Sequence, residues 1–163
     1  MSAFTKYVRS TLEQAGREAQ LDRSSRIEAQ HVLLAISTQL ETPAARLLLS
    51  LGLDHRALRD AFERERAHSL RVAGVSLEGF ELPRPDVSEG AAGVAIVTEL
   101  GTSFRTALER GVSGVRRNPR PEHLLLGILG AEHGTVPRAL ALAGIDRGAL
   151  RRSVQHALLK SAA

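Results

Sequence analysis

Hydrophobic residues recur every three or four positions at the start of the chain, which is the spacing of an amphipathic helix. The residues that follow this spacing are Phe4, Val8, Leu12, Ala15 and Ala19. The polar string D-R-S-S at 22–25 then interrupts the pattern. We therefore expect the chain to open with one helix that ends at this turn.

The next stretch predicts three further helices. The apolar string V-L-L-A-I lies within a second helix over about 28–40. Thr42 and Pro43 favour the start of a third, because threonine caps helices and proline suits the first turn. Gly52 ends that helix, since glycine readily adopts the left-handed conformation found at helix C-termini, and Asp54 caps a fourth.

The second half of the chain repeats the first. His31 and His123 lie 92 residues apart in the similar strings A-Q-H-V-L-L-A-I and P-E-H-L-L-L-G-I. Other positions that match at this offset, without a gap, are Leu48 with Leu140, Gly52 with Gly144, Asp54 with Asp146 and Leu58 with Leu150. So many matches in a single register indicate an internal duplication.

The second repeat predicts the same order of four helices. Its first helix covers about 88–112, although Gly101 weakens it and favours a break there. Pro121 begins the next helix, Gly134 leads into the third, and Asp146 caps the last.

Glycine and proline punctuate the segment between the repeats, which predicts a linker over 67–87. We then expect the first repeat over 1–66 and the second over 88–163. A four-helix repeat of this size buries its apolar faces poorly alone, so both repeats are expected to form one compact domain. The predicted fold class is all-α: two tandem four-helix repeats, about eight helices, related by pseudo-twofold symmetry.

Composition narrows the classes of function. The chain has no Cys, which excludes disulfides, thiolate catalysis and cysteine-based zinc sites. Its net charge of +4 comes from arginines interleaved with acids, and aromatic residues are only 3%, which argues against a nucleic-acid surface. No segment approaches the about 20 apolar residues of a membrane span, and no signal peptide is evident. We expect a cytoplasmic protein that has no contact with membranes.

Motifs for catalysis or cofactor binding are absent from the sequence. It has neither H-E-x-x-H for zinc nor G-x-x-x-x-G-K-[ST] for a nucleotide phosphate. We therefore expect no enzyme activity, metal or cofactor. His31 and His123 are the only histidines that recur by duplication. They are expected to bond to a neighbouring backbone at a helix start or to pack between repeats, with a ligand or proton-transfer role as the alternative.

The string E-H-L-L-L-G-I-L at 122–129, its copy at 30–37 and the pair Phe4-Thr5, 27 residues before His31, resemble the Clp N-terminal domain family. The resemblance covers nearly the whole chain. It implies two four-helix repeats of the kind that cap AAA+ unfoldases and receive adaptors and substrates. Without ATPase motifs, it implies a free-standing adaptor, accessory subunit or decoy of a Clp unfoldase or protease. Sequestration of a Clp-targeting cyclic-peptide antibiotic is the alternative.

The resemblance suggests four residues for binding a protein or peptide: Phe4, Thr5, Gln30 and Glu122. Each has a plain alternative: Phe4 as core, Thr5 as a helix cap, and the other two as solvated first-turn residues. Some relatives bind phosphorylated arginine through a Glu that follows Thr, and Glu122 would make that contact here.

The chain also departs from the family pattern. Pro121 replaces the Thr before Glu122, and the first repeat has Ala29-Gln30 at the equivalent pair. Ile96-Val97 stands where the family usually has Phe-Thr. These departures put phosphoarginine binding in the first repeat, and contacts of an aromatic ring in the second, in doubt.

Overall fold

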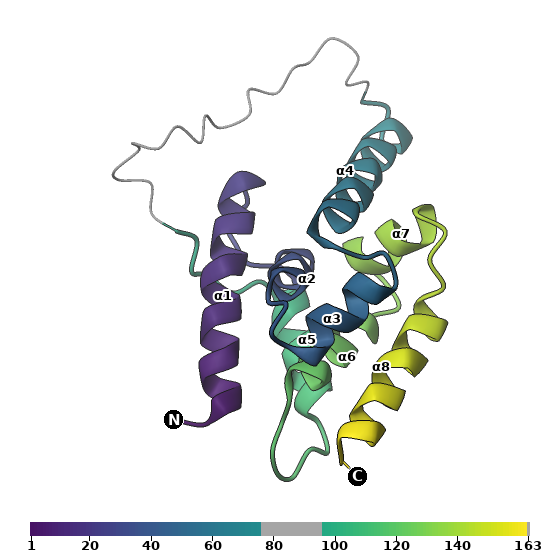
Figure 1. Cartoon of the computed structure of the whole chain (residues 1–163). Helices are drawn as coiled ribbons and strands as arrows, with labels where there is room; N and C mark the ends of the chain where they lie inside the picture. The colour runs from purple at the N-terminus through teal and green to yellow at the C-terminus, as the bar shows by residue number, and fades with distance from the viewer. Residues whose placement is uncertain (76–95, 163) are drawn as a thin grey trace.

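A computed structural model describes residues 1–75 and 96–162, which form eight helices arranged as two repeats of four (Figure 1). The helices of the first repeat are α1 (Ala3–Leu21), α2 (Ala29–Thr38), α3 (Pro43–Ser50) and α4 (His55–Val72). Those of the second are α5 (Thr102–Val112), α6 (Pro121–Leu129), α7 (Thr135–Leu142) and α8 (Arg147–Ala162). The predicted all-α fold is confirmed.

Short polar side chains begin several of these helices. Thr42 caps α3 and Asp54 caps α4, each by accepting a hydrogen bond from the backbone N–H three residues later, at 3.2 and 2.8 Å. Asp146 accepts the equivalent bond at the start of α8, at 3.0 Å. These three predicted caps satisfy backbone donors that the helices themselves leave unpaired.

The two repeats share local geometry as well as sequence. The Nδ1 atoms of His31 and His123 each accept a hydrogen bond from the backbone N–H three residues earlier, at 3.0 and 2.9 Å. Gly52 and Gly144 both follow their helices in the left-handed region, with φ of 75° and 73°. The predicted pseudo-twofold duplication is thus confirmed, as is the expectation that both histidines bond to neighbouring backbone.

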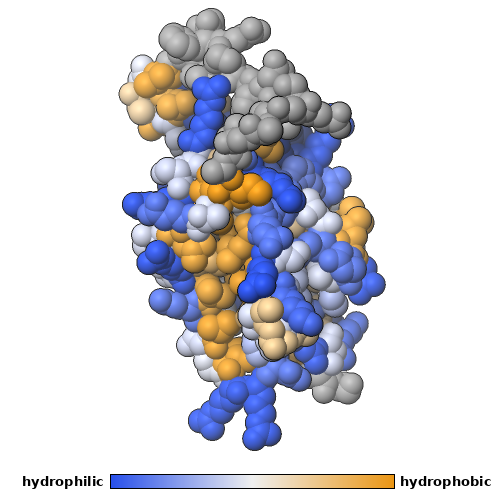
Figure 2. Space-filling model, turned by 90° about the vertical axis from the view of Figure 1, so that its left-hand side faces the viewer, coloured by the Kyte–Doolittle hydropathy of each residue, from blue (hydrophilic) through white to orange (hydrophobic). Residues whose placement is uncertain are grey.

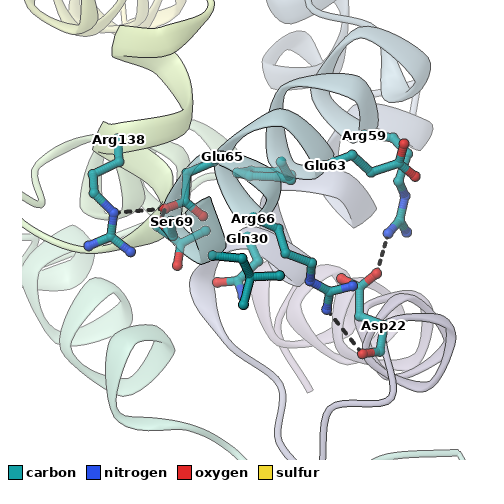
Figure 3. A pocket seen from close by; sticks show the side chains of 11 residues that line it. Asp22, Gln30, Arg59, Glu63, Glu65, Arg66, Ser69 and Arg138 are labelled. Atoms are coloured by element: carbon teal, nitrogen blue, oxygen red, sulfur yellow. Dashed lines mark hydrogen bonds and ion pairs between the residues drawn. The ribbon is translucent and has the colours of Figure 1, made fainter. Parts of the chain in front are cut away.

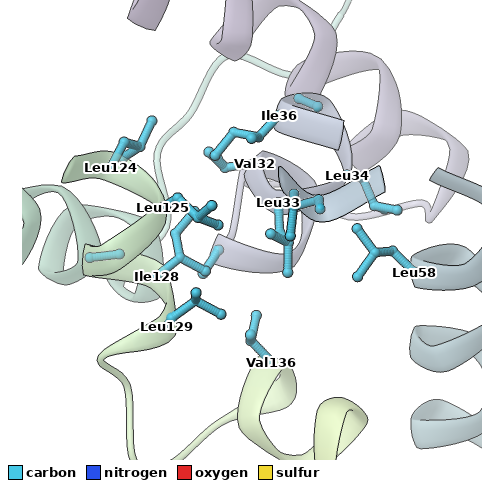
Figure 4. Packing of buried hydrophobic residues seen from close by; sticks show 14 of the residues in the cluster. Val32, Leu33, Leu34, Ile36, Leu58, Leu124, Leu125, Ile128, Leu129 and Val136 are labelled. Atoms are coloured by element: carbon cyan, nitrogen blue, oxygen red, sulfur yellow. The ribbon is translucent and has the colours of Figure 1, made fainter. Parts of the chain in front are cut away.

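A single aliphatic core joins the repeats (Figure 4). Its centre lies where α2 faces α6. The buried residues that these two helices contribute include Val32, Leu33, Ile36, Leu125, Ile128 and Leu129. Leu58 from α4 and Val136 from α7 extend the same cluster at its edge. Burial of this apolar surface is the main stabilising contribution to the fold.

The helix α4 is longer than the sequence analysis predicts. It continues to Val72 and ends where Gly74 adopts φ of 81°. The N–H groups of Gly74 and Val75 bond back to Arg71 and Leu70, at 3.0 and 2.8 Å, which completes a Schellman motif. The predicted linker is therefore wrong for residues 67–72, and its residues 76–87 lie outside those the structure describes.

The predicted helix over 88–112 is also wrong in its described N-terminal part. Residues 96–101 are extended, and α5 begins only at Thr102, after the break expected near Gly101. The extended segment pairs with the turn before α2, because Ile27 donates to the Glu99 carbonyl at 2.7 Å and accepts from Gly101 N–H at 2.8 Å. Residues 88–95 lie outside the described part of the chain.

In the second repeat, α5 and α6 approach each other very closely. A Cβ atom added at Gly127 would collide with the backbone carbonyl of Ala107. The matching position in the first repeat is Ala35, which is fully buried against α1. Gly127 therefore permits a backbone contact that no other residue type would allow.

The surface on the side of α1 is mixed. A strip of apolar surface runs down this face between polar and charged side chains (Figure 2). Among the described helices, none is long and apolar enough to cross a membrane alone. The pair α2 and α3 passes that test together by length and composition only, and it is bent by 91°.

Candidate functional site

Gln30, at the start of α2, lies where two cavities of about 240 and 330 Å³ adjoin. The smaller opens toward α4 and the larger toward α5, and both are bordered by Thr135 and Arg138 of α7. Together they form what we call the Gln30 cleft, and Figure 3 shows the smaller of the two. Because its walls come from both repeats, the cleft exists only in the assembled fold.

An ion pair crosses the Gln30 cleft from one repeat to the other. Arg138 on α7 donates its Nε to Oε1 of Glu65 on α4 at 2.8 Å, and the hydroxyl of Ser69 donates to the same oxygen at 2.5 Å. Glu65 is only 4% exposed, whereas Arg138 is largely in solvent. A buried carboxylate requires such partners, so the pair fixes the wall of the cleft.

A second charged network lies at the end of α1. Arg59 pairs with both Glu18 and Asp22, His55 lies 2.8 Å from Glu18, and His31 Nε2 lies 3.2 Å from Asp22. Burial alone would raise the pKa of Asp22, but the hydrogen bond from His31 and the charge of Arg59 outweigh it and hold this pKa below its ordinary value. The network ties the end of α1 to α2 and α4.

The sequence analysis missed both Glu18 and Glu65, although their positions carry a signal. Glu65 follows Leu58 and Ala61 at helical spacing, so it falls on the buried face of α4. Glu18 occupies the same kind of position on α1, beside Ala15 and Ala19. An acidic residue on an apolar helix face predicts a buried ion pair, but the sequence does not name its partner.

A second cavity, of about 540 Å³, lies at the other end of α1, and we call it the Phe4 cavity. Phe4 and Tyr7 line it from α1, and Thr42 and Pro121 line it from the starts of α3 and α6. The rings of Phe4 and Tyr7 are tilted against each other, with centroids 6.3 Å apart. Burial raises the pKa of Tyr7 well above its ordinary value, so this hydroxyl stays neutral at physiological pH.

The four residues predicted for binding do not form one site. Phe4 is half-buried and lines the Phe4 cavity, whereas Thr5 is exposed and the N-cap of α1 is Ser2, with Thr5 N–H donating to Ser2 Oγ at 3.1 Å. Gln30 lines the Gln30 cleft. Glu122 occupies the equivalent position in the second repeat but is only 2% exposed. The alternatives of Thr5 as a cap and Glu122 as a solvated residue are therefore wrong.

Glu122 has an unusual environment for an acid. Its Oε2 atom is buried and has no hydrogen-bond partner among the described residues. Its charge lies close enough to Tyr7 to contribute to the raised pKa of that side chain. Pro121, its neighbour in the sequence, lines the Phe4 cavity, whereas Glu122 itself does not.

The pair Ile96-Val97 does not reproduce the setting of Phe4-Thr5. Phe4 and Thr5 belong to the first turn of α1, whereas Ile96 and Val97 precede α5 in the extended segment. The carbonyl of Val97 lies so close to Gly16 on α1 that a side chain there would clash with it. The two repeats therefore differ most where their first helices begin.

Comparison with known proteins identifies the first repeat. Residues 3–79 match the family model described as the Clp repeat (R) N-terminal domain, so the match includes α1 to α4. A search of curated proteins gives no match. Within residues 1–75 and 96–162, no group of three His, Asp or Glu side chains is placed to hold a metal ion.

Proposed function

Residues 3–79 belong to the Clp repeat N-terminal domain family, and on this premise we propose that the chain is a non-catalytic protein-binding module of a Clp unfoldase or protease system. The family match is the observation that carries the proposal. The internal duplication supports it for the second repeat, which completes the same fold. In this role the chain acts as an adaptor, an accessory subunit or a decoy.

The Gln30 cleft is the surface that we propose for the partner. Leu70 is its partly exposed apolar residue on α4, Phe62 and Val136 form its buried floor, and the side chains of Arg66 and Arg138 border it. Protein interfaces combine apolar burial, which provides affinity, with a polar rim, which sets orientation. The cleft offers both in a wall that spans the two repeats.

Capture from a lysate tests this proposal. The immobilised chain is incubated with a lysate of its source organism, and enrichment of a Clp unfoldase, a protease subunit or their substrates is measured by mass spectrometry. Gln30→Arg places a long cation in the cleft and should reduce capture at least about tenfold. Gln20→Arg, a similar change on α1 away from the cleft, should leave capture unchanged. Absence of Clp components above a denatured bait would overturn the proposal.

Sequestration of a cyclic-peptide antibiotic is the second candidate, and the Phe4 cavity is the observation that favours it. Its aromatic pair and its volume of about 540 Å³ suit an apolar ring better than the charged Gln30 cleft does. A Clp-directed cyclic peptide should then raise the melting temperature of the purified chain, and Phe4→Ala should abolish that rise. An unchanged melting temperature at saturating peptide removes this candidate.

A further inference from the structure

The duplicated histidines differ in what they face. His31 directs its Nε2 at the carboxylate of Asp22, 3.2 Å away. The residue that corresponds to Asp22 in the second repeat is Gly114, which has no side chain and lies in an exposed turn with φ of 78°. The acid that accompanies the histidine in the first repeat is therefore missing from the second.

The rest of this turn has also lost acidic residues and gained arginines. Residues 22–28 contain two acids, whereas the corresponding residues 114–120 contain three arginines and no acid. Arg151 corresponds to Arg59, which binds Asp22 in the first repeat. The Nε atom of Arg151 is buried without a hydrogen-bond partner in the described part of the chain. The second repeat has kept the cationic half of this network and lost its anionic half.

An open cavity of about 610 Å³, which we call the His123 cavity, is lined by residues of this turn, by His123 and by residues of α8. Its polar lining includes His123, Arg117 and Arg120, and no acidic residue lines it. Arg120 is held at the end of α8, where its Nη2 donates to the Ser161 carbonyl at 3.1 Å. The cavity thus gathers positive charge with nothing in its lining to neutralise it.

The hydrogen-bonding state of His123 follows from its backbone contact. Its Nδ1 accepts from the N–H of Arg120 at 2.9 Å, so in the neutral ring the hydrogen is on Nε2. Nε2 is therefore a donor, as it is in His31, where the acceptor is Asp22. A carboxylate is the acceptor that this nitrogen meets in the first repeat.

The opposite wall of the His123 cavity is apolar. Val115 lies on the turn, and Leu158 and Leu159 lie on the last turns of α8. Leu159 is 72% exposed, so its side chain is accessible to a partner. The corresponding residues of the first repeat are Arg23, Arg66 and Ala67, so this apolar wall belongs to the second repeat alone.

We propose that the His123 cavity binds an acidic side chain, Asp or Glu, of a partner protein, together with the apolar residue beside it. The carboxylate takes the place that Asp22 has in the first repeat, and accepts hydrogen bonds from His123 and Arg117. The apolar neighbour packs on the wall formed by Leu158 and Leu159. Two observations favour an acidic side chain here. The cavity is lined by cations, and in the first repeat the equivalent histidine already bonds to the carboxylate of Asp22.

This proposal deepens the protein-binding function and rests on it, but its test uses only the purified chain. The probes are two fluorescent peptides with both ends blocked, of sequence Gly-Ser-Leu-Asp-Leu-Ser-Gly and the same sequence with Asn in place of Asp. Fluorescence anisotropy at low salt should show binding of the Asp peptide at least about tenfold tighter than of the Asn peptide, the effect of one charge-assisted hydrogen bond.

Two variants locate the binding. Arg117→Gln removes a cation that lines the cavity and should weaken binding of the Asp peptide roughly tenfold. Arg116→Gln removes the adjacent exposed arginine, which does not line the cavity, and should have little effect. Leu159→Asp should abolish binding by placing a like charge in the apolar wall. Since Leu159 is exposed, this variant should still fold.

Three outcomes would overturn the proposal. Equal binding of the Asp and Asn peptides would show that no carboxylate is recognised. Equal losses in Arg116→Gln and Arg117→Gln would indicate nonspecific charge attraction. Binding only of a peptide with a free C-terminal carboxylate would assign the cavity to chain ends instead of acidic side chains. Tight binding of the Asp peptide without capture of Clp components would reject the Clp assignment and leave this proposal standing.

Discussion

Arg138 of the second repeat donates its Nε to the buried carboxylate of Glu65 in the first repeat over 2.8 Å. The bond closes one side of the Gln30 cleft and is an ionic contact between helices that are distant in sequence. Its two ends differ in exposure, because Glu65 is 4% exposed and the Arg138 side chain 57%. Loss of the arginine therefore leaves a buried charge, whereas loss of the acid leaves a solvated one.

This asymmetry predicts the order of stability of the wild type and two variants. Arg138→Ala should lower the free energy of unfolding by about 1–3 kcal/mol, because Glu65 stays buried with only Ser69 to bond it. Arg138→Ala combined with Glu65→Gln should be more stable than Arg138→Ala alone, since the buried charge is gone. Urea denaturation measures all three free energies. An Arg138→Ala variant with an unchanged midpoint would contradict the structural role given to the pair.

The close approach of α5 and α6 predicts a second effect on stability. Gly127→Ala should destabilise the protein by about 1–3 kcal/mol, because its Cβ collides with the Ala107 backbone. Gly148→Ala on α8 is the matched control. An added Cβ there would meet no backbone atom and would lie 3.2 Å from the capping Oδ1 of Asp146, which needs to shift only slightly. The higher helix propensity of alanine should then stabilise α8 by up to about 1 kcal/mol. Thermal melting of both variants should give shifts of opposite sign.

Asp22 predicts a loss of stability in acid. Its pKa is lower in the folded protein than in the unfolded chain, so its contribution is complete above the ordinary value of 3.8 and is lost as the pH falls through the folded value. Asp22→Asn should lower the free energy of unfolding at pH 7 by about 1–3 kcal/mol. Below about pH 4 the difference from wild type should shrink.

The exposed Asp60 on α4 provides the control for this pH dependence. Asp60→Asn should change the free energy of unfolding little at either pH, because exposed charges contribute little. If Asp22→Asn and wild type differed equally at pH 7 and pH 3, the stabilisation would not depend on the charge of Asp22.

Substitutions at the equivalent positions Glu122 and Gln30 should have different effects on stability. Glu122→Gln should raise the free energy of unfolding by about 1 kcal/mol or more, because it removes a buried charge with one unpartnered oxygen. Gln30→Glu adds a charge in a half-buried cleft bordered by arginines and should be nearly neutral. Chemical denaturation compares the two. A loss of stability in Glu122→Gln would mean that the carboxylate is paired after all.

The sequence predicts most of the helices because their signals are local. Thr42, Asp54 and Asp146 lie immediately before the helices that they cap, and Gly52 and Gly144 lie immediately after those that they end. The same kind of signal was available at Gly74, which ends α4 as Gly52 ends α3. The predicted linker begins at residue 67, seven positions before Gly74, so the sequence analysis ends the fourth helix too early.

The extended segment before α5 is a different case. Its apolar residues Ile96, Val97 and Leu100 suit a helix by spacing, but their backbone follows the turn at Ile27 in the other repeat. That partner lies far away in the sequence, so no local pattern reports it. The contacts that form the candidate sites cannot be predicted from the sequence for the same reason. Gln30 and Phe4 each line a cavity, and their role in binding stays a prediction. The sequence around Glu65 gives no sign that its partner is Arg138.

The bridge between Ile27 and Leu100 has a consequence for the order of folding. These residues are 73 positions apart, so the bridge closes a long loop. Closing the loop costs conformational entropy, which rises only slowly with loop length. The chain loses this entropy before the contact stabilises it. The extended segment before α5 can pair only after the turn between α1 and α2 has formed. During synthesis the N-terminal repeat emerges first, and the second repeat can then fold against it.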